Sequence, residues 1–290
     1  MCTPFTSTGN FNYMAYEKLI NFQIKQGTDA IVSCGTTGEA TTLTKDEHIE
    51  IVQSAVAITR ESNRKYNRKV PVIAGAGGND TAKCIEMGRA LVQAGADALM
   101  YVTPYYNKTS QKGLVQHYTA IAGAVDVPIV VYNVPLRAAL NILPNTLFEI
   151  SKIPNIVAIK EASGDIVQVA EMIELCGDAL TVYSGNDNHI VPVLSLGGKG
   201  VISTIANIVP AQVHEMVMAY IGGDWEKSVS LQMGILPLVR YLFTDVNPMP
   251  VKAALNLMGF KMGRCRPPLT DIDEDLHENL KHEMTRYGII

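Results

Sequence analysis

The residue that most directly suggests chemistry is Lys160, which ends the apolar run 156–159 a few residues before Gly164. Short apolar runs rich in β-branched residues are typical of strands that are buried on both faces of a parallel sheet. A lysine in such surroundings can lose its charge, because burial disfavours the ammonium form, and the neutral amine can attack a ketone to form a Schiff base. A commoner role for a strand-end lysine is to reach water or to pair with a carboxylate. The residues at the ends of the other predicted strands distinguish between these two interpretations.

Hydroxyl and phenol groups stand where other predicted strands end. Thr36 and Thr37 lie in the glycine-flanked turn 35–39, whose amides and hydroxyls can hold a small carboxylate. A tight turn in which the threonines bond their own backbone fits this segment equally well. Tyr106 follows the predicted strand 98–102, and Tyr132 is the last residue of the predicted strand 128–132. A buried tyrosine is more often a core residue with a bonded hydroxyl, but one that faces an amine can relay protons.

A guanidinium group completes the set. Arg137 follows Pro135 in a short loop and can hold a second carboxylate through two parallel hydrogen bonds, although most single arginines are surface residues. A lysine that can be neutral, a phenol, a carboxylate cradle and an arginine are together what a Schiff-base aldol condensation between two carboxylate-bearing substrates requires. The convergence of these groups favours this chemistry.

Composition excludes several other classes of function. The chain has 290 residues, a net charge of -4 and 18% charged residues, which is typical of an ordinary soluble surface without a basic stripe for nucleic acid. No apolar run is long enough to cross a membrane. The 5 cysteines form no CxxC pair and the 6 histidines no HExxH motif, so we expect reduced packing cysteines and no metal site. The glycine clusters at 75–78 and 197–200 match neither GxGxxG nor a P-loop.

The scaffold must bring several strand ends together. Apolar runs separated by helical patterns predict strands at 1–5, 30–34, 70–74, 98–102, 128–132, 155–160, 180–183 and 200–203. Eight strands close a (β/α)8 TIM barrel, whose active sites lie at the carboxyl ends of the strands. The first predicted strand is shorter than a barrel normally needs, so the barrel has a weak seam there or the start is misplaced.

Helical patterns connect and follow these strands. The first helix is predicted at 13–26, and a capping box formed by Thr44 and Glu47 begins another that runs to about 60, before a polar connection at 61–69. After Gly223 only helical patterns remain, at 225–243, 249–258 and 273–287. We therefore expect a barrel domain over 1–222 with a truncated first strand and a three-helix domain over 223–290.

Several segments together resemble one known family, the class I aldolases that include dihydrodipicolinate synthase and N-acetylneuraminate lyase. The resemblance covers nearly the whole chain and is carried by the segments 35–39, 105–107, 132–137, 159–162, 184–187, 200–203 and 247–252. The double threonine after Gly35 and the arginine two places after Pro135 resemble the synthase branch rather than the sugar-acid lyases.

The resemblance implies a lyase with four catalytic residues. Lys160 would form the imine with pyruvate, and Tyr132 would act as proton donor and acceptor. Thr36 would link Tyr132 to Tyr106, which in this family is supplied across a subunit contact. No cofactor is implied, since the substrate itself forms the covalent intermediate.

The same resemblance implies the substrates and the assembly. Thr37 and Ile202 would hold pyruvate, Gly185 would line the pocket, and Arg137 would receive the carboxylate of aspartate semialdehyde. The product, 4-hydroxy-tetrahydrodipicolinate, leads to lysine and diaminopimelate. The family likeness also implies a cytoplasmic homotetramer built as a dimer of dimers, with no nucleic-acid or membrane partner.

Lysine inhibits some members of this family at a site near the subunit contact. The corresponding positions here are Ala40, Thr41, Lys45, His48, Asn79, Lys83 and Tyr105. In the sensitive branch a glutamate stands at the place of Lys83, and Lys45 replaces a histidine. Because cations would repel lysine, we expect weak or absent feedback inhibition. Initial rates with added lysine test this, and an inhibition constant in the low micromolar range would contradict it.

Two other functions stay open on sequence grounds. One is retro-aldol cleavage of N-acetylneuraminate or a 2-keto-3-deoxy sugar acid, for which the second pocket would favour hydroxyls over a carboxylate. The other is a non-catalytic barrel that binds a keto acid as a sensor, which the short first strand makes worth testing. A covalent pyruvate adduct would exclude the sensor, and the choice of aldehyde would separate the two enzymes.

Overall fold

The structure is a computed structural model that describes residues Met1–Ile290. Seven strands alternate with helices along the chain, which is the element order of the predicted (β/α)8 class. The residues form two compact units, Ile73–Ser203 and Met1–Val72 with Thr204–Ile290, and each is described by itself. The predicted division into 1–222 and 223–290 stays a prediction. None of the helices is both long and apolar enough to span a lipid bilayer.

The unit Ile73–Ser203 is built on a parallel sheet whose strands pair in chain order. Its strands are β2 (Val72–Gly75), β3 (Ala98–Val102), β4 (Ile129–Asn133), β5 (Ile156–Glu161), β6 (Thr181–Ser184) and β7 (Gly200–Val201). Every residue of β4 is buried, as expected for a strand covered on both faces. Because all strands run in the same direction, their carboxyl ends share one edge of the sheet.

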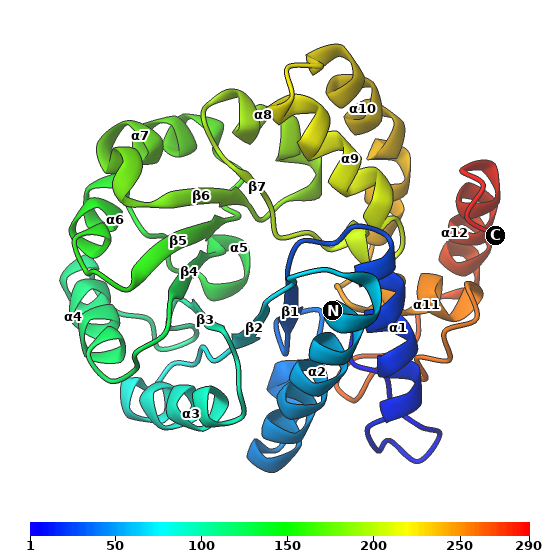
Figure 1. Cartoon of the computed structure of the whole chain (residues 1–290), viewed down its shortest axis with the longest axis horizontal. Helices are drawn as coiled ribbons and strands as arrows, with labels where there is room; N and C mark the ends of the chain where they lie inside the picture. Colours follow the sequence, from blue (N-terminus) through cyan, green and yellow to red (C-terminus); the bar gives the residue numbers. More distant parts are fainter. The chain divides into compact units, whose positions relative to one another are not determined.

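Helices connect these strands and cover the sheet. They are α3 (Thr81–Gln93), α4 (Gln111–Ala122), α5 (Pro135–Ala138), α6 (Pro144–Ser151), α7 (Ile166–Cys176) and α8 (Ile190–Ser195). Figure 1 shows α3, α4, α6 and α7 along the outside of the curved sheet. Helices α3, α6 and α8 contact the strands, and α4 and α7 pack against neighbouring helices. The short α5 is part of the loop that follows β4.

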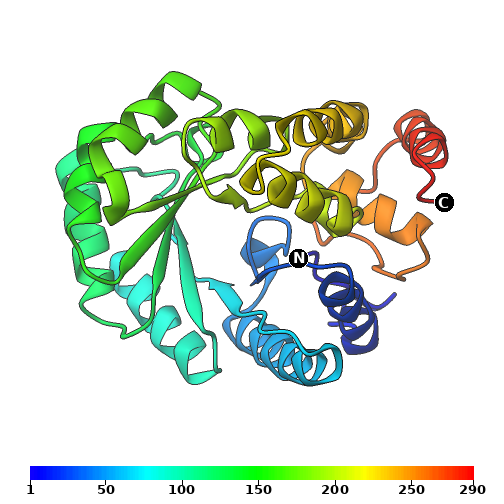
Figure 2. The same cartoon turned by 45° about the horizontal axis from the view of Figure 1, so that its top comes forward.

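The other unit contains a single strand and most of the long helices. Its elements are α1 (Tyr13–Lys25), β1 (Ile31–Ser33), α2 (Lys45–Tyr66), α9 (Pro210–Ile221), α10 (Trp225–Leu242), α11 (Met249–Leu257) and α12 (Glu274–Arg286). Helix α1 packs against α2, and α10 packs against α9, α11 and α12, which Figure 2 shows from a second side. The three predicted C-terminal helices are confirmed to within one residue at either end.

Two details of the predicted elements are wrong. Residues 1–5 form no regular strand: Phe5 makes an isolated bridge with Phe11, and the terminal amine of Met1 donates a hydrogen bond to the Val32 carbonyl at 2.8 Å. The segment is held by scattered contacts, because it is too short for a continuous ladder.

Helix α2 also continues past the predicted end near residue 60. The predicted polar connection at 61–69 is wrong, since the helix runs to Tyr66 and stops at Asn67, whose φ is 50°. The side chain of Asn63 exchanges hydrogen bonds of 2.9 and 3.0 Å with the backbone of Val70, and the buried Ser62 hydroxyl donates to Asn21. These contacts stabilise the last turns, and the local sequence does not reveal them.

Candidate active site

The side chain of Lys160 lies against a tyrosine on the neighbouring strand. Lys160 of β5 is in register with Tyr132 of β4 and with Tyr183 of β6. Residues in register on parallel strands project to the same face of the sheet. The Nζ atom of Lys160 is 4.4 Å from the centre of the Tyr132 ring, and Tyr132 is 7% exposed. Lys160 is half-buried and forms no ion pair, so the carboxylate partner considered from the sequence is not observed.

A glycine at the end of β6 makes room for this lysine. A Cβ atom added to Gly185 would lie 2.7 Å from the Cβ of Ala162, 3.0 Å from the Glu161 carbonyl and 3.1 Å from the Cγ of Lys160. The Gly185 amide donates to the same Glu161 carbonyl at 2.6 Å. No larger residue fits here without moving the Lys160 stem.

Gly185→Ala is therefore expected to slow covalent capture of a keto acid at Lys160 by about 10–100-fold, because small displacements of a reacting group are costly. The rate of borohydride-trapped adduct formation measures this. Gly234→Ala is the matched control, since nothing lies within 4 Å of the added carbon. An unchanged rate in Gly185→Ala, with wild-type melting behaviour, would contradict the close contact.

Three other predicted site residues of this unit follow strands of the same sheet. Ile202 comes directly after β7, and its amide donates to the Ser184 carbonyl at 2.9 Å. Arg137 lies exposed on α5, two residues after Pro135 begins that helix. Tyr106 follows β3, is 90% exposed and has a φ of 70°, a left-handed conformation that is uncommon for a tyrosine. All three belong to the carboxyl-end edge of the sheet, whereas Tyr132 lies directly beside the Lys160 amine.

The predicted carboxylate cradle belongs to the other unit. The Nδ2 atom of Asn247 donates to the Thr37 hydroxyl at 3.0 Å, and the Thr36 carbonyl accepts from the Glu39 amide at 3.1 Å. Thr36 and Thr37 are both half-buried, with backbone bonds across the turn from Gly38 to Gly35. The two threonines thus stand in a well-bonded turn, and the link from Thr36 to Tyr132 stays a prediction.

A buried ion pair holds this turn. Glu39 is 3% exposed and has a φ of 56°, and its carboxylate accepts from the Lys252 amine at 2.6 Å and from the Arg266 amide at 2.8 Å. Lys252 is 2% exposed, and its amine also donates to the Arg264 carbonyl at 3.0 Å. The amine of Lys252 and the guanidinium of Arg266 each lie 4.3 Å from the centre of the Phe5 ring. Sequence reasoning missed this pair; a lysine inside the apolar pattern of α11 was its only signal.

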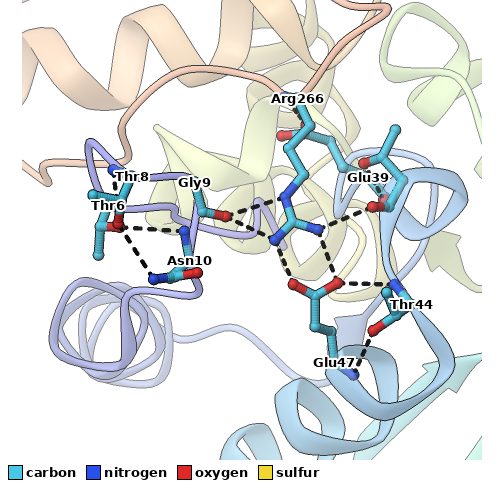
Figure 3. A network of polar contacts seen from close by, with 9 residues as sticks. Thr6, Thr8, Gly9, Asn10, Glu39, Thr44, Glu47 and Arg266 are labelled. Atoms are coloured by element: carbon cyan, nitrogen blue, oxygen red, sulfur yellow. Dashed lines mark hydrogen bonds and ion pairs between the residues drawn. The ribbon is translucent and has the colours of Figure 1, made fainter.

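Arg266 extends the network to the first turn of α2. Its guanidinium donates two parallel hydrogen bonds to the Glu47 carboxylate, and it also donates to the Gly9 carbonyl (Figure 3). Glu47 in turn accepts from the Thr44 amide at 2.8 Å and completes the predicted capping box, which is confirmed. The hydrogen bonds from Arg266 lower the pKa of Glu47 to about 2.

This shift predicts a specific loss of stability in acid. Because the pKa of Glu47 is lower in the folded chain than its unfolded value of about 4.3, its carboxylate stabilises the fold above pH ~4.3. That contribution is lost as the pH falls from there to about 2. Glu47→Gln should have a lower melting temperature than the wild type near neutral pH. As the pH falls from ~4.3 to about 2, its melting temperature should also decrease less steeply than that of the wild type.

Melting curves of the wild type, Glu47→Gln and Glu50→Gln across this pH range check the expectation. Glu50 is an exposed residue of the same helix, so its variant should follow the wild type. A wild-type acid profile in Glu47→Gln would show that the contact with Arg266 does not stabilise the fold.

The described residues contain no group of three or more histidine, cysteine, aspartate or glutamate side chains placed to hold a metal ion.

The buried thiols are unsuited to act as nucleophiles. Burial raises the pKa of the Cys2 and Cys34 thiols to about 12 in each case. The candidate reactive groups of the site are the amine, phenol, hydroxyl and guanidinium groups described above.

Known proteins resemble the chain along its whole length. The model of the dihydrodipicolinate synthetase family matches residues 1–286. The 4-hydroxy-tetrahydrodipicolinate synthase of Thermoanaerobacter sp. (strain X514) is 51% identical over 289 residues, which are 99% of this chain and 95% of the relative.

Solved structures also resemble the chain. The dihydrodipicolinate synthase of Acinetobacter baumannii, solved with pyruvate, is 39% identical with a TM-score of 0.95, over 100% of this chain and 97% of that one. The enzyme of Cyanidioschyzon merolae, solved with lysine bound, is 36% identical with a TM-score of 0.94, over 100% and 97%. These likenesses confirm the predicted fold class.

Proposed function

The chain belongs to the dihydrodipicolinate synthetase family, and from this premise we propose that it condenses pyruvate with aspartate semialdehyde to give 4-hydroxy-tetrahydrodipicolinate. It is a lyase of the class I aldolase type. The observation that carries the proposal is the amine of Lys160, which lies beside Tyr132 and has no carboxylate partner. An amine in an ion pair would have to lose that partner before it could attack a ketone.

The reaction begins when the Lys160 amine attacks the keto carbon of pyruvate and water leaves, so that an imine forms. Loss of a methyl proton gives the enamine, whose carbon attacks the aldehyde of the second substrate. Tyr132 donates and accepts protons in these steps, and its place beside Lys160, with 4.4 Å between the amine and the ring centre, supports this role. The amino group of the added substrate then attacks the imine carbon, closes the ring and releases Lys160. No cofactor takes part.

The remaining residues bind substrates or move protons. Thr37 and Ile202 hold the pyruvate, Gly185 leaves space beside Lys160, and Arg137 binds the carboxylate of the semialdehyde. These roles come from the family resemblance, and the position of each residue after a strand of the fold supports them.

Thr36 and Tyr106 belong to the proton relay in this proposal. Tyr106 is 90% exposed in a left-handed backbone conformation, which supports its supply to the site of a neighbouring subunit. A cytoplasmic homotetramer, arranged as a dimer of dimers, follows from the same family resemblance. Sedimentation of the wild type tests the assembly.

Turnover of two classes of substrate tests the proposed function. The wild type should consume pyruvate together with aspartate semialdehyde, and Arg137→Ala should lose most, but not all, of that turnover while it still forms the pyruvate imine. Arg89→Ala, which removes an exposed cation from α3, is the matched control. Cleavage of N-acetylneuraminate or a 2-keto-3-deoxy sugar acid that survives Arg137→Ala would support the sugar-acid lyase instead. Folded wild type that forms no pyruvate adduct would favour a sensor.

A further inference from the structure

One buried side chain connects the beginning of the loop that carries Arg137 to the end of that loop. Asn133, the last residue of β4, is fully buried. Its Oδ1 atom accepts from the amide of Ile142 at 3.0 Å, and its Nδ2 atom donates to the side chain of Asn141 at 2.9 Å. The residue that begins the loop therefore binds the two residues that end it.

Two further side chains complete this arrangement. The Nδ2 atom of Asn133 also donates to the Glu161 carboxylate at 2.8 Å. Asn141 donates to the Oε1 atom of Gln168 on α7 at 2.6 Å, and Gln168 donates back to Asn141 at 3.2 Å. We call Asn133, Asn141, Glu161 and Gln168 the amide clasp. It joins β4, the loop, β5 and α7, so the loop cannot shift without breaking several buried hydrogen bonds.

The carboxylate in the clasp is unusual because no cation pairs with it. Glu161 is 2% exposed, and its second oxygen accepts from the Ser163 amide at 2.6 Å. Burial raises the pKa of Glu161, and the hydrogen bonds to Ser163 and Asn133 oppose this rise. A buried carboxyl group that is held by neutral donors alone is costly, and such groups are often functional.

A second contact fixes the far end of the loop from α4. The side chain of Gln111 donates to the Asn141 carbonyl at 2.8 Å and accepts from the Leu143 amide at 3.1 Å. Within the loop, Ala138 is buried, whereas Arg137 is exposed. The backbone is thus anchored on both sides of the one exposed guanidinium that the proposed function uses.

We propose that the amide clasp positions Arg137 and thereby determines that the second substrate must carry a carboxylate. This inference rests on the proposed function. The clasp residues act through Arg137, because they hold the backbone of its loop rather than the substrate. A misplacement of about 1 Å at such a binding group can lower turnover by up to roughly 10²-fold.

Asn141→Ala tests the proposal, since this variant opens the clasp on the side away from Lys160. We expect KM for aspartate semialdehyde to rise about tenfold, while the rate of pyruvate imine formation stays within about twofold of the wild type. Asn155→Ala is the matched control. Asn155 donates to the Ala122 and Val125 carbonyls at 3.0 Å each, at the opposite end of β5, so its loss should leave both quantities unchanged.

A double-mutant cycle separates positioning from general support of the fold. In the Arg137→Ala background, Asn141→Ala should add less than about a twofold further loss, because the group that the clasp positions is already absent. Fully additive losses, or an equal loss of imine formation, would overturn the proposal. Gln168→Leu breaks the same contact from α7 and replaces Asn141→Ala if that variant does not fold.

Imine formation in the wild type distinguishes failure of the proposed function from failure of this inference. Wild-type protein that forms no pyruvate imine overturns the proposed function and this inference with it. Wild-type protein that forms the imine, together with an unchanged KM for the semialdehyde in Asn141→Ala, overturns the inference alone.

Discussion

Lys160→Met is expected to abolish condensation, with a loss on the order of 10⁴-fold or more, because the variant lacks the amine proposed to form the covalent bond to pyruvate. Methionine keeps much of the apolar stem of lysine and packs in the same space, so the fold should be retained. The steady-state rate of consumption of both substrates measures the effect. Circular dichroism and the melting temperature confirm that the variant is folded.

Lys152→Met provides the control for this loss. The amine of Lys152 also lies over an aromatic ring, at 4.3 Å from the centre of Phe148, but it pairs with Glu149 at 2.7 Å and stands at the end of α6. The two variants remove the same group from similar aromatic surroundings. A residual rate in Lys160→Met close to that of Lys152→Met would show that the reaction proceeds without an imine at residue 160.

Lys252→Met is expected to destabilise the fold by about 3–5 kcal/mol, the usual cost of removing one partner of a buried ion pair. The variant leaves the carboxylate of Glu39 buried at 3% exposure and without the Lys252 amine, while the Arg266 amide still donates to it. Because Glu39 also belongs to the turn that carries Thr36 and Thr37, activity should fall with stability. Urea unfolding monitored by fluorescence measures the free energy.

The variant Lys252→Met/Glu39→Gln distinguishes this cause from loss of packing. Glu39→Gln removes the buried negative charge that Lys252→Met leaves without its cation, so the double variant should recover part of the lost stability. A single variant within about 1 kcal/mol of the wild type, or a double variant that is less stable than the single one, would contradict the importance of the pair.

Strands and helices with a strong local pattern were predictable from the sequence. The strand at 98–102 has the predicted bounds, and the capping box at Thr44 begins α2 where the sequence places it. The position of Lys160 on the same face as Ile156 and Ala158 follows from the two-residue period of the strand, whereas its register with Tyr132 comes from the structure. These features depend on residues that are close in sequence or on the topology as a whole.

Features that depend on distant contacts were not predictable. The buried pair of Glu39 and Lys252 joins residues that are 213 positions apart, and nothing near Glu39 indicates its left-handed backbone. The amide clasp draws its side chains from four separate segments, and the end of α2 depends on a bond from Ser62 to Asn21. The periodicity of apolar residues indicates which side chains are buried, but it does not indicate which polar groups bond to one another.

The proposed condensation depends on covalent capture of a ketone by one amine. Incubation with isotopically labelled pyruvate, reduction with borohydride and peptide mass mapping test it most directly. We expect a single stable adduct on the peptide that contains Lys160, and no adduct in Lys160→Met. Folded wild-type protein that carries no label, or that carries it on another lysine, would contradict the account.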